Sequence, residues 1–115
     1  MIEGMACVFC AIAAGEIPAT VVHETDDVVA FRDLKPVAPV HVLVIPRQHY
    51  RDVRDLAADP ATMVAVLQAV DVVAASEGLD EGFRVVFNTG GQGGQEVDHV
   101  HAHVIGGRQM QWPPG

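Results

Sequence analysis

The segment His99-Val100-His101-Ala102-His103-Val104-Ile105 alternates histidine with small or branched apolar residues. Successive side chains of a β-strand point to opposite faces, so this alternation predicts a strand over residues 99–105 whose three histidines share one face. Val100, Ala102 and Val104 then face the opposite side, toward a core. Three of the chain's six histidines fall within the five positions 99–103, and this concentration favours a functional site over three unrelated surface residues.

The rest of the chain predicts a small α+β domain around this strand. Runs of β-branched and aromatic residues, bounded by turn residues or proline, indicate four further strands. A long helix is expected over residues 60–77, where apolar residues recur at spacings of three and four and Gly78 follows as a stop signal. A short helix is expected over residues 7–14. With strands before and after one long helix, the sheet should be largely antiparallel and five-stranded. Its strands are expected at residues 21–24, 28–32, 41–45, 83–88 and 99–105.

Length and composition limit the kinds of protein this can be. The 115 residues fit one domain, residues 1–115, and a content of 50% hydrophobic and 19% charged residues is typical of an ordered globular chain. With 15 Asp+Glu against 7 Lys+Arg, the net charge of -8 disfavours a nucleic-acid partner, because such binding requires cations that neutralise phosphates. There is no signal peptide and no apolar run of about 20 residues, so we expect no membrane partner and a cytoplasmic location.

The loop that precedes the histidine strand narrows the chemistry of the site. Asn88-Thr89-Gly90-Gly91-Gln92-Gly93-Gly94-Gln95 is rich in glycine, so its backbone N–H groups can approach and hold an oxyanion such as phosphate. A phosphate beside an imidazole favours nucleophilic catalysis by histidine. A catalytic metal bound by all three histidines is the alternative. Alternate residues on one strand lie roughly 7 Å apart, however, so their convergence on one ion requires distortion.

The only two cysteines, Cys7 and Cys10, form a Cys-x-x-Cys pair. In a chain without a secretory signal, this spacing is typical of a redox-active pair or of half a tetrahedral zinc site. A zinc site needs two further ligands, for which His49 and His99 are the candidates.

The histidine strand resembles the motif of the histidine triad (HIT) family, which is His-x-His-x-His followed by two apolar residues. Residues 106–115, ending Trp-Pro-Pro-Gly, are similar to the tail of its histidine triad nucleotide-binding (Hint, protein kinase C inhibitor-like) branch. The similarity runs from Cys7 through 30–33 and 39–46 to 88–115. It implies a HIT-like fold that dimerises into a continuous ten-stranded sheet. It also implies hydrolysis of purine nucleoside phosphoramidates, including adenylate joined to an amine, through a covalent nucleotidyl-histidine intermediate.

The resemblance assigns catalytic roles to individual histidines. His101 is expected to be the nucleophile on the α-phosphorus, flanked by His99 and His103. His103 and Asn88 would contact or place the phosphate. His41, the family's fourth histidine, would sit beside the triad and help to fix its protonation.

The resemblance also implies a nucleotide pocket. Asp33 would accept hydrogen bonds from the ribose hydroxyls, and an apolar set would hold the purine base, although Ile12 and Leu43 are as typical of plain core. Trp112, the only tryptophan, would lie against a partner subunit and reach its active site. The expected nucleotide-binding residues are Val8, Phe9, Ile12, Ile17, Phe31, Asp33, Leu34, Leu43, Asn88, Gly94, Gln95, Val97, His101, His103 and Trp112.

One position departs from the Hint pattern. Glu96 follows the glycine-rich loop where that branch usually has serine. A serine hydroxyl can donate a hydrogen bond to the phosphate or to the leaving group, whereas an ionised glutamate only accepts and repels a phosphate. We therefore expect Glu96 either to turn outward or to face the leaving group and favour a cationic amine.

The resemblance supports a structural zinc on Cys7, Cys10, His49 and His99, as in many bacterial histidine triad proteins. A four-ligand site has no open position. Such a zinc would fix the N-terminal segment to the histidine strand and take no part in the chemistry.

Two other functions fit the same residues. A dinucleoside polyphosphate hydrolase of the fragile-histidine kind would use the same nucleophile on a phosphoanhydride, but the tail over residues 112–115 weighs against it. A nucleotide-binding scaffold, which works through its dimer surface with incidental catalysis, is the alternative outside enzymes. Substitution of His101 separates chemistry from scaffolding.

Overall fold

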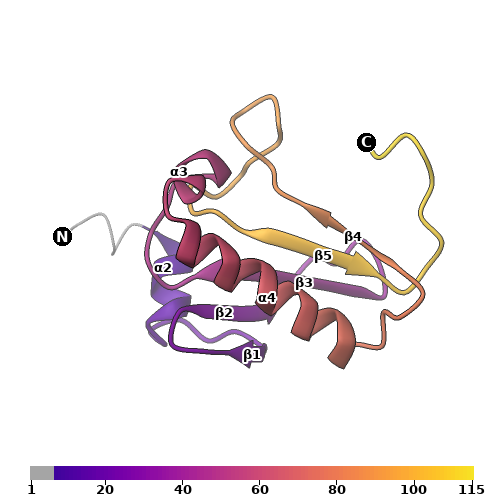
Figure 1. Cartoon of the computed structure of the whole chain (residues 1–115), viewed down its shortest axis with the longest axis horizontal. Helices are drawn as coiled ribbons and strands as arrows, with labels where there is room; N and C mark the ends of the chain where they lie inside the picture. The colour runs from indigo at the N-terminus through magenta and orange to yellow at the C-terminus, as the bar shows by residue number, and fades with distance from the viewer. Residues whose placement is uncertain (1–6) are drawn as a thin grey trace.

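The computed structural model describes residues 7–115, and its centre is one five-stranded sheet with the strand order β1-β2-β3-β5-β4 (Figure 1). Every pair of neighbouring strands is antiparallel, which confirms the predicted α+β architecture. The last strand in the chain lies beside the third, so the histidine segment runs through the interior of the sheet and not along its edge. The strands are β1 (Val21–Glu24), β2 (Val28–Arg32), β3 (Val40–Pro46), β4 (Phe83–Val86) and β5 (Ala102–Gly106).

The long helix, α4 (Pro60–Ser76), crosses one face of the sheet (Figure 1). It begins where expected because Asp59 caps its first turn, accepting a hydrogen bond from the Thr62 N–H at 3.2 Å. Its buried stripe packs on the alternate strand residues that face it, in the larger core cluster. This cluster includes Val28, Ala30, Val42, Val44, Val66, Ala69, Val70, Val73, Ala74, Val100, Ala102 and Val104. No helix within residues 7–115 is long and apolar enough to traverse a lipid bilayer.

The opposite face of the sheet carries the short N-terminal helix α2 (Val8–Ala13). Phe9 packs there in a second, smaller cluster with strand residues that include Phe31 and Leu43. The rings of Phe9 and Phe31 meet edge to face, with centroids 5.4 Å apart. Leu43 pairs across the sheet with His103, and paired residues of antiparallel strands point to the same side. The face under α2 is therefore also the face of the triad.

The histidine strand is shorter than predicted, because β5 begins at Ala102 instead of residue 99. Just before β5 the backbone leaves the ladder with β3: the Val100 N–H donates to the Tyr50 carbonyl, in the loop after β3, at 2.7 Å. The predicted alternation of sides still holds. Val100 lies in the core under α4, whereas the rings of His101 and His103 contact each other on the other face, with centroids 4.9 Å apart. β4 is also shorter than predicted and ends before the loop that the Asn88 side chain holds.

A second short helix, α3 (Val53–Ala57), is absent from the sequence prediction. Asp52 caps it by accepting hydrogen bonds from the backbone N–H groups of Arg54 and Asp55 at 3.0 and 3.1 Å. The fully buried Leu56 anchors the helix to the core. One and a half turns are too short to show a helical repeat of apolar residues, so periodicity cannot detect such a helix.

Candidate active site and metal centre

His101 lies at the centre of the site, nearly buried, on the segment that leads into β5. Its Nδ1 is 2.8 Å from the carbonyl oxygen of His99. Since a carbonyl only accepts, Nδ1 carries the proton and Nε2 keeps the lone pair. Nε2 forms no hydrogen bond with any residue of the range 7–115. The Phe9 ring stands edge-on beside the imidazole, with centroids 5.1 Å apart, so His101 is held in place while its Nε2 stays available to a ligand.

A chain of hydrogen bonds fixes the protons of His41 and His103. The Val37 N–H donates to His41 Nδ1 at 3.2 Å, so a neutral His41 carries its proton on Nε2. That nitrogen lies 2.9 Å from His103 Nδ1 and 3.4 Å from an Asp33 carboxylate oxygen, both of which can accept the proton. A neutral His103 then carries its own proton on Nε2, which makes it a hydrogen-bond donor.

Burial keeps both of these rings neutral near pH 7. It lowers the pKa of His103 to about 4, helped by the neighbouring His101 and His41 and opposed by the Asp33 carboxylate. Burial also lowers the pKa of His41, again against the pull of Asp33. Each ring therefore has one N–H and one lone pair, as the hydrogen-bond chain requires.

An apolar cavity of about 360 Å³ opens beside His101 and His103. This volume is within the range of small-ligand pockets. Its walls come from the helix α2, the strands β2 and β3, the segment that precedes β1, and the end of the glycine-rich loop. These parts of the chain meet only in the folded protein. The structure gathers around it many of the predicted residues, namely Val8, Phe9, Ile12, Ile17, Phe31, Asp33, Leu34, Leu43, Glu96, Val97, His101 and His103.

Four residues of the cavity wall lie outside the predicted set: Pro18, Ala19, Thr20 and Arg32. They follow or separate predicted residues in the sequence, and this contiguity is the signal that could have identified them. The Arg32 guanidinium is paired with Glu77 at the end of α4, at 2.9 Å, so its charge is already matched within the fold.

The glycine-rich loop is held by its own side chains. Asn88 Nδ2 donates to the Gly93 carbonyl at 2.8 Å, and Gln95 Nε2 donates to two backbone carbonyls at 2.7 and 3.0 Å. A Cβ on Gly93 would lie 2.2 Å from the Thr89 carbonyl oxygen, so only glycine fits there. The predicted nucleotide-binding residues that do not line the cavity are Asn88, Gly94, Gln95 and Trp112.

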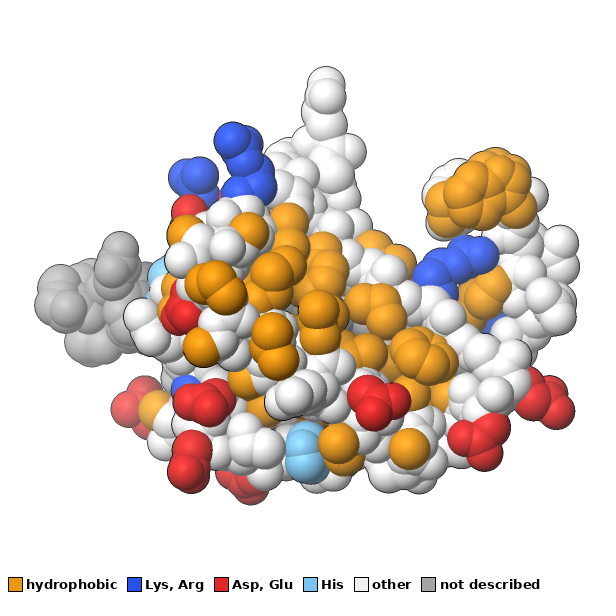
Figure 2. All heavy atoms as spheres, viewed as in Figure 1, with side chains coloured by type: hydrophobic (Ala, Val, Ile, Leu, Met, Phe, Trp, Pro, Cys, Tyr) orange, Lys and Arg blue, Asp and Glu red, His pale blue; other side chains and the backbone are white. Residues whose placement is uncertain are grey.

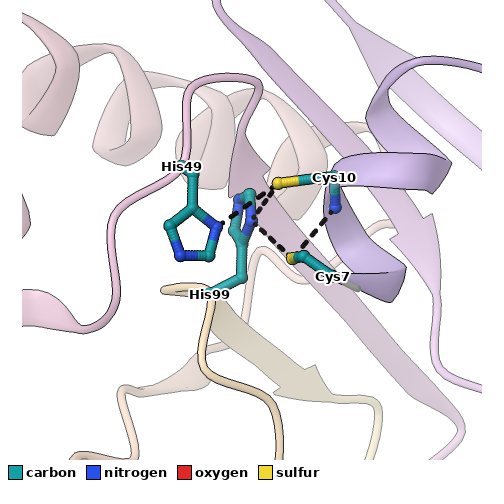
Figure 3. Close-up of side chains that lie close together, drawn as sticks. All are labelled: Cys7, Cys10, His49 and His99. Atoms are coloured by element: carbon teal, nitrogen blue, oxygen red, sulfur yellow. Dashed lines mark hydrogen bonds between the residues drawn. The ribbon is translucent and has the colours of Figure 1, made fainter. Parts of the chain in front are cut away.

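Four side chains of types that can ligate a metal come from three segments and converge next to this site (Figure 3). We call Cys7, Cys10, His49 and His99 the metal-binding cluster, because together they could hold a metal ion. Cys7 and Cys10 come from the start of α2, His49 from the loop after β3, and His99 from the segment before β5. Their ligand atoms all lie within 4.8 Å of one another. His99 Nδ1 is 3.4 Å from both sulfur atoms, and His49 Nδ1 is 3.3 Å from the Cys10 sulfur.

This donor set fits a tetrahedral zinc ion. Zn–S bonds of about 2.3 Å and Zn–N bonds of about 2.0 Å place sulfur and nitrogen about 3.5 Å apart at a tetrahedral centre, close to the observed separations. His99 Nε2–H donates to the Pro46 carbonyl at 2.9 Å, which leaves the Nδ1 lone pair on the side of the sulfur atoms. Burial lowers the pKa of His99 to about 4, so the ring is in its neutral, metal-binding form.

Comparison with known proteins identifies the family. Residues 14–110 match the family model of the HIT domain. The chain belongs to the HIT domain family. The 14 kDa zinc-binding protein of Brassica juncea is 49% identical over 116 residues, which cover 94% of this chain and 98% of that protein. Adenylylsulfatase HINT1 of Arabidopsis thaliana is 48% identical over 116 residues, which cover 94% of this chain and 76% of that protein.

A solved HIT structure gives the same result for the fold. The crystal structure of a HIT family hydrolase from Legionella pneumophila Philadelphia 1 superimposes on this chain with a TM-score of 0.91 at 50% identity, covering 95% of this chain and 99% of that one. The family resemblance and the HIT-like fold expected from the sequence are therefore confirmed. In this HIT domain, the segment 99–103 supplies one histidine to the metal-binding cluster and two to the cavity.

Proposed function

We propose that this HIT domain is a nucleotide hydrolase that cleaves purine nucleoside phosphoramidates to the nucleoside monophosphate. The observation that carries the proposal is the lone pair of His101 Nε2, held by a backbone hydrogen bond beside an apolar cavity. Asp33 lines the same cavity, where its carboxylate can accept hydrogen bonds from ribose hydroxyls. Relatives named as a hydrolase and an adenylylsulfatase support the reaction class.

The reaction takes place in two displacements at the α-phosphorus. First, His101 Nε2 forms a bond to phosphorus as the bond to the leaving nitrogen breaks, and that nitrogen takes the electron pair and a solvent proton and departs as an amine. Then water attacks phosphorus, gives its proton to solvent, and the bond to His101 breaks, so the nucleoside monophosphate leaves. The His99 carbonyl stabilises the positive charge on the His101 ring, and His103 Nε2–H donates to a phosphate oxygen.

The second proposal concerns the metal-binding cluster, Cys7, Cys10, His49 and His99, which we expect to hold a structural zinc ion. The donor geometry supports it, and so does the name of the Brassica juncea relative. When bound, the zinc supplies a cross-link between α2 and the segment that enters β5. It takes no part in the reaction, because its four ligands fill a tetrahedral site.

The third proposal is a homodimer in which β4 pairs with β4 of a second copy to give a ten-stranded sheet. β4 is an edge strand, and its exposed Phe83 and Val85 add to exposed apolar residues of α4 such as Leu67. Figure 2 shows hydrophobic side chains gathered on this face of the molecule. An apolar open edge favours pairing with another strand. Trp112, 83% exposed, would then reach the partner.

Sedimentation tests the homodimer. The wild type should sediment as a dimer that Val85→Lys converts to a monomer, and a wild-type monomer would contradict this proposal.

The hydrolase is tested by intact mass spectrometry after a rapid denaturing quench with an adenylate phosphoramidate. We expect a gain of one adenylyl group in the wild type and none in His101→Ala. His23→Ala is the matched control, because His23 lies on β1 outside the cavity and the metal-binding cluster, and it should form the adduct normally. Turnover of dinucleoside polyphosphates alone would favour the phosphoanhydride hydrolase. Nucleotide binding with neither adduct nor turnover would favour the scaffold.

A further inference from the structure

A second cavity, of about 660 Å³, adjoins the apolar cavity beside His101 and His103. Val8, Glu96 and Val97 line both cavities, so these side chains form the boundary between them. A ligand whose phosphate lies at this boundary can extend into both spaces. The remaining residues of the second cavity are Cys7, His49, Arg51, Asp55 and Asp98.

The second cavity is acidic. It carries the carboxylates of Asp55, Glu96 and Asp98 against one guanidinium, that of Arg51. The Arg51 Nε lies 3.7 Å from a carboxylate oxygen of Asp52, so its positive charge is already partly balanced. Within residues 7–115 the Glu96 carboxylate makes no hydrogen bond and no ion pair. Its negative charge is therefore free to act on a ligand.

We propose that the second cavity receives the leaving group and that Glu96 selects a leaving amine which carries an additional positive charge. The inference rests on the proposed function, because only a phosphoramidate presents an amine there. A cation in this position is attracted by both the α-phosphate and Glu96, whereas an anion is repelled by both. Glu96 thus acts as a specificity-determining residue: its repulsion of the phosphate disfavours neutral and anionic leaving groups, and a cationic one offsets that repulsion.

The selection can be measured with three adenylates that differ only in the terminal charge of the amine. The amines are 1,5-diaminopentane, pentylamine and 6-aminohexanoate, which share a five-carbon chain and end in a cation, a methyl group and an anion. For wild type at low ionic strength, we expect kcat/KM of the diamine adduct to exceed that of the pentylamine adduct about tenfold, with the carboxylate adduct lower by a similar factor. Added salt should reduce both ratios, because the charges are exposed.

The variant Glu96→Gln keeps the shape of the side chain and removes its charge. The ratio between the diamine and pentylamine adducts should then fall to about two to three, since the phosphate and the carboxylates of Asp55 and Asp98 still attract the terminal cation. Glu81→Gln is the matched control, because Glu81 is an exposed acid in a third cavity formed by residues 78–82 and 107–109, and it should keep the wild-type ratio.

The outcomes separate this inference from the function on which it rests. If the wild type hydrolyses all three adducts at equal kcat/KM, or if Glu96→Gln keeps the wild-type ratio, the selection by Glu96 is wrong and the hydrolase stands. If none of the three is hydrolysed, the proposed function fails, and the inference fails with it.

Discussion

The metal-binding cluster and the histidines that line the cavity share one face of the sheet, yet their ring nitrogens are used in opposite ways. In His99 the backbone takes Nε2, through the Pro46 carbonyl, and Nδ1 lies beside two sulfur atoms. In His101 the backbone takes Nδ1, and Nε2 is left for a ligand. The difference teaches that the backbone, by occupying one ring nitrogen, decides which nitrogen each imidazole can offer to a metal or a ligand.

His99 and Phe9 connect the two regions, and the Phe9 ring contacts both His99 and His101. The His99 side chain belongs to the metal-binding cluster, while its carbonyl oxygen accepts the proton of His101 Nδ1. A change in one region can therefore reach the other through these two residues, although His101 and His103 contribute no ligand atom to the metal-binding cluster. Variants that disable one region while sparing the other test this separation.

The largest expected effect is that of His101→Ala on turnover. Removal of the nucleophile should lower kcat/KM for an adenylate phosphoramidate by more than about a thousandfold. Bound zinc, measured by elemental analysis, should not change, because His101 contributes no atom to the metal-binding cluster. Loss of zinc together with activity would show that the two regions are not separate.

The converse variant is Cys10→Ser, which replaces a thiolate by a poor zinc ligand. If the concentration of free zinc exceeds the dissociation constant about a thousandfold, loss of the bound ion lowers the free energy of unfolding by about 4 kcal/mol. Chemical denaturation with and without a chelator measures this. The chelator should destabilise the wild type and leave Cys10→Ser unaffected. Equal stability of the two proteins with zinc present would contradict a structural metal.

A smaller effect is expected from His41, which acts through His103. His41→Phe keeps an aromatic ring but removes the donor that fixes the His103 proton, so kcat/KM should fall about tenfold, as is usual when an orienting partner is lost. His41→Gln can still donate from its amide and should recover part of the loss. Equal rates for both variants and the wild type would exclude a positioning role.

The smallest effect is the dependence of stability on pH that comes from the burial of His103. Burial lowers the pKa of His103 from 6.5 to about 4 in the folded chain, so between these values the unfolded chain binds more protons. The contribution of His103 is complete above about pH 6.5 and is lost as the pH falls toward 4. Urea unfolding measures the free energy of unfolding at pH 7.5 and at pH 5.0. The decrease between these two pH values should be smaller in His103→Gln than in the wild type. A larger loss in the variant would contradict a neutral, buried His103.

The alternation in segment 99–105 and the apolar spacing of segment 60–77 were enough to predict the sheet, the long helix and the face that carries the triad. These patterns are periodic, so they register which side of an element faces a core. A single domain and a cytoplasmic location stay predictions of the sequence. The start of β5 could not be predicted, because the partner of Val100 is the Tyr50 carbonyl, which lies far away in the chain. The helix α3 was missed because its 5 residues are too few to show a helical repeat of apolar residues.

Residue identity alone determined the chemistry that the site can offer: imidazoles on one face of a strand, two thiols at the start of a helix and a carboxylate where the Hint branch usually has serine. The tertiary structure decided how these groups are divided. It placed His99 with the cysteines and His101 beside the cavity. It used the side chains of Asn88 and Gln95 to hold the glycine-rich loop, and it put Glu96 between two cavities. These outcomes depend on which distant carbonyl or side chain each group meets, and only the packing of the folded chain brings such partners together.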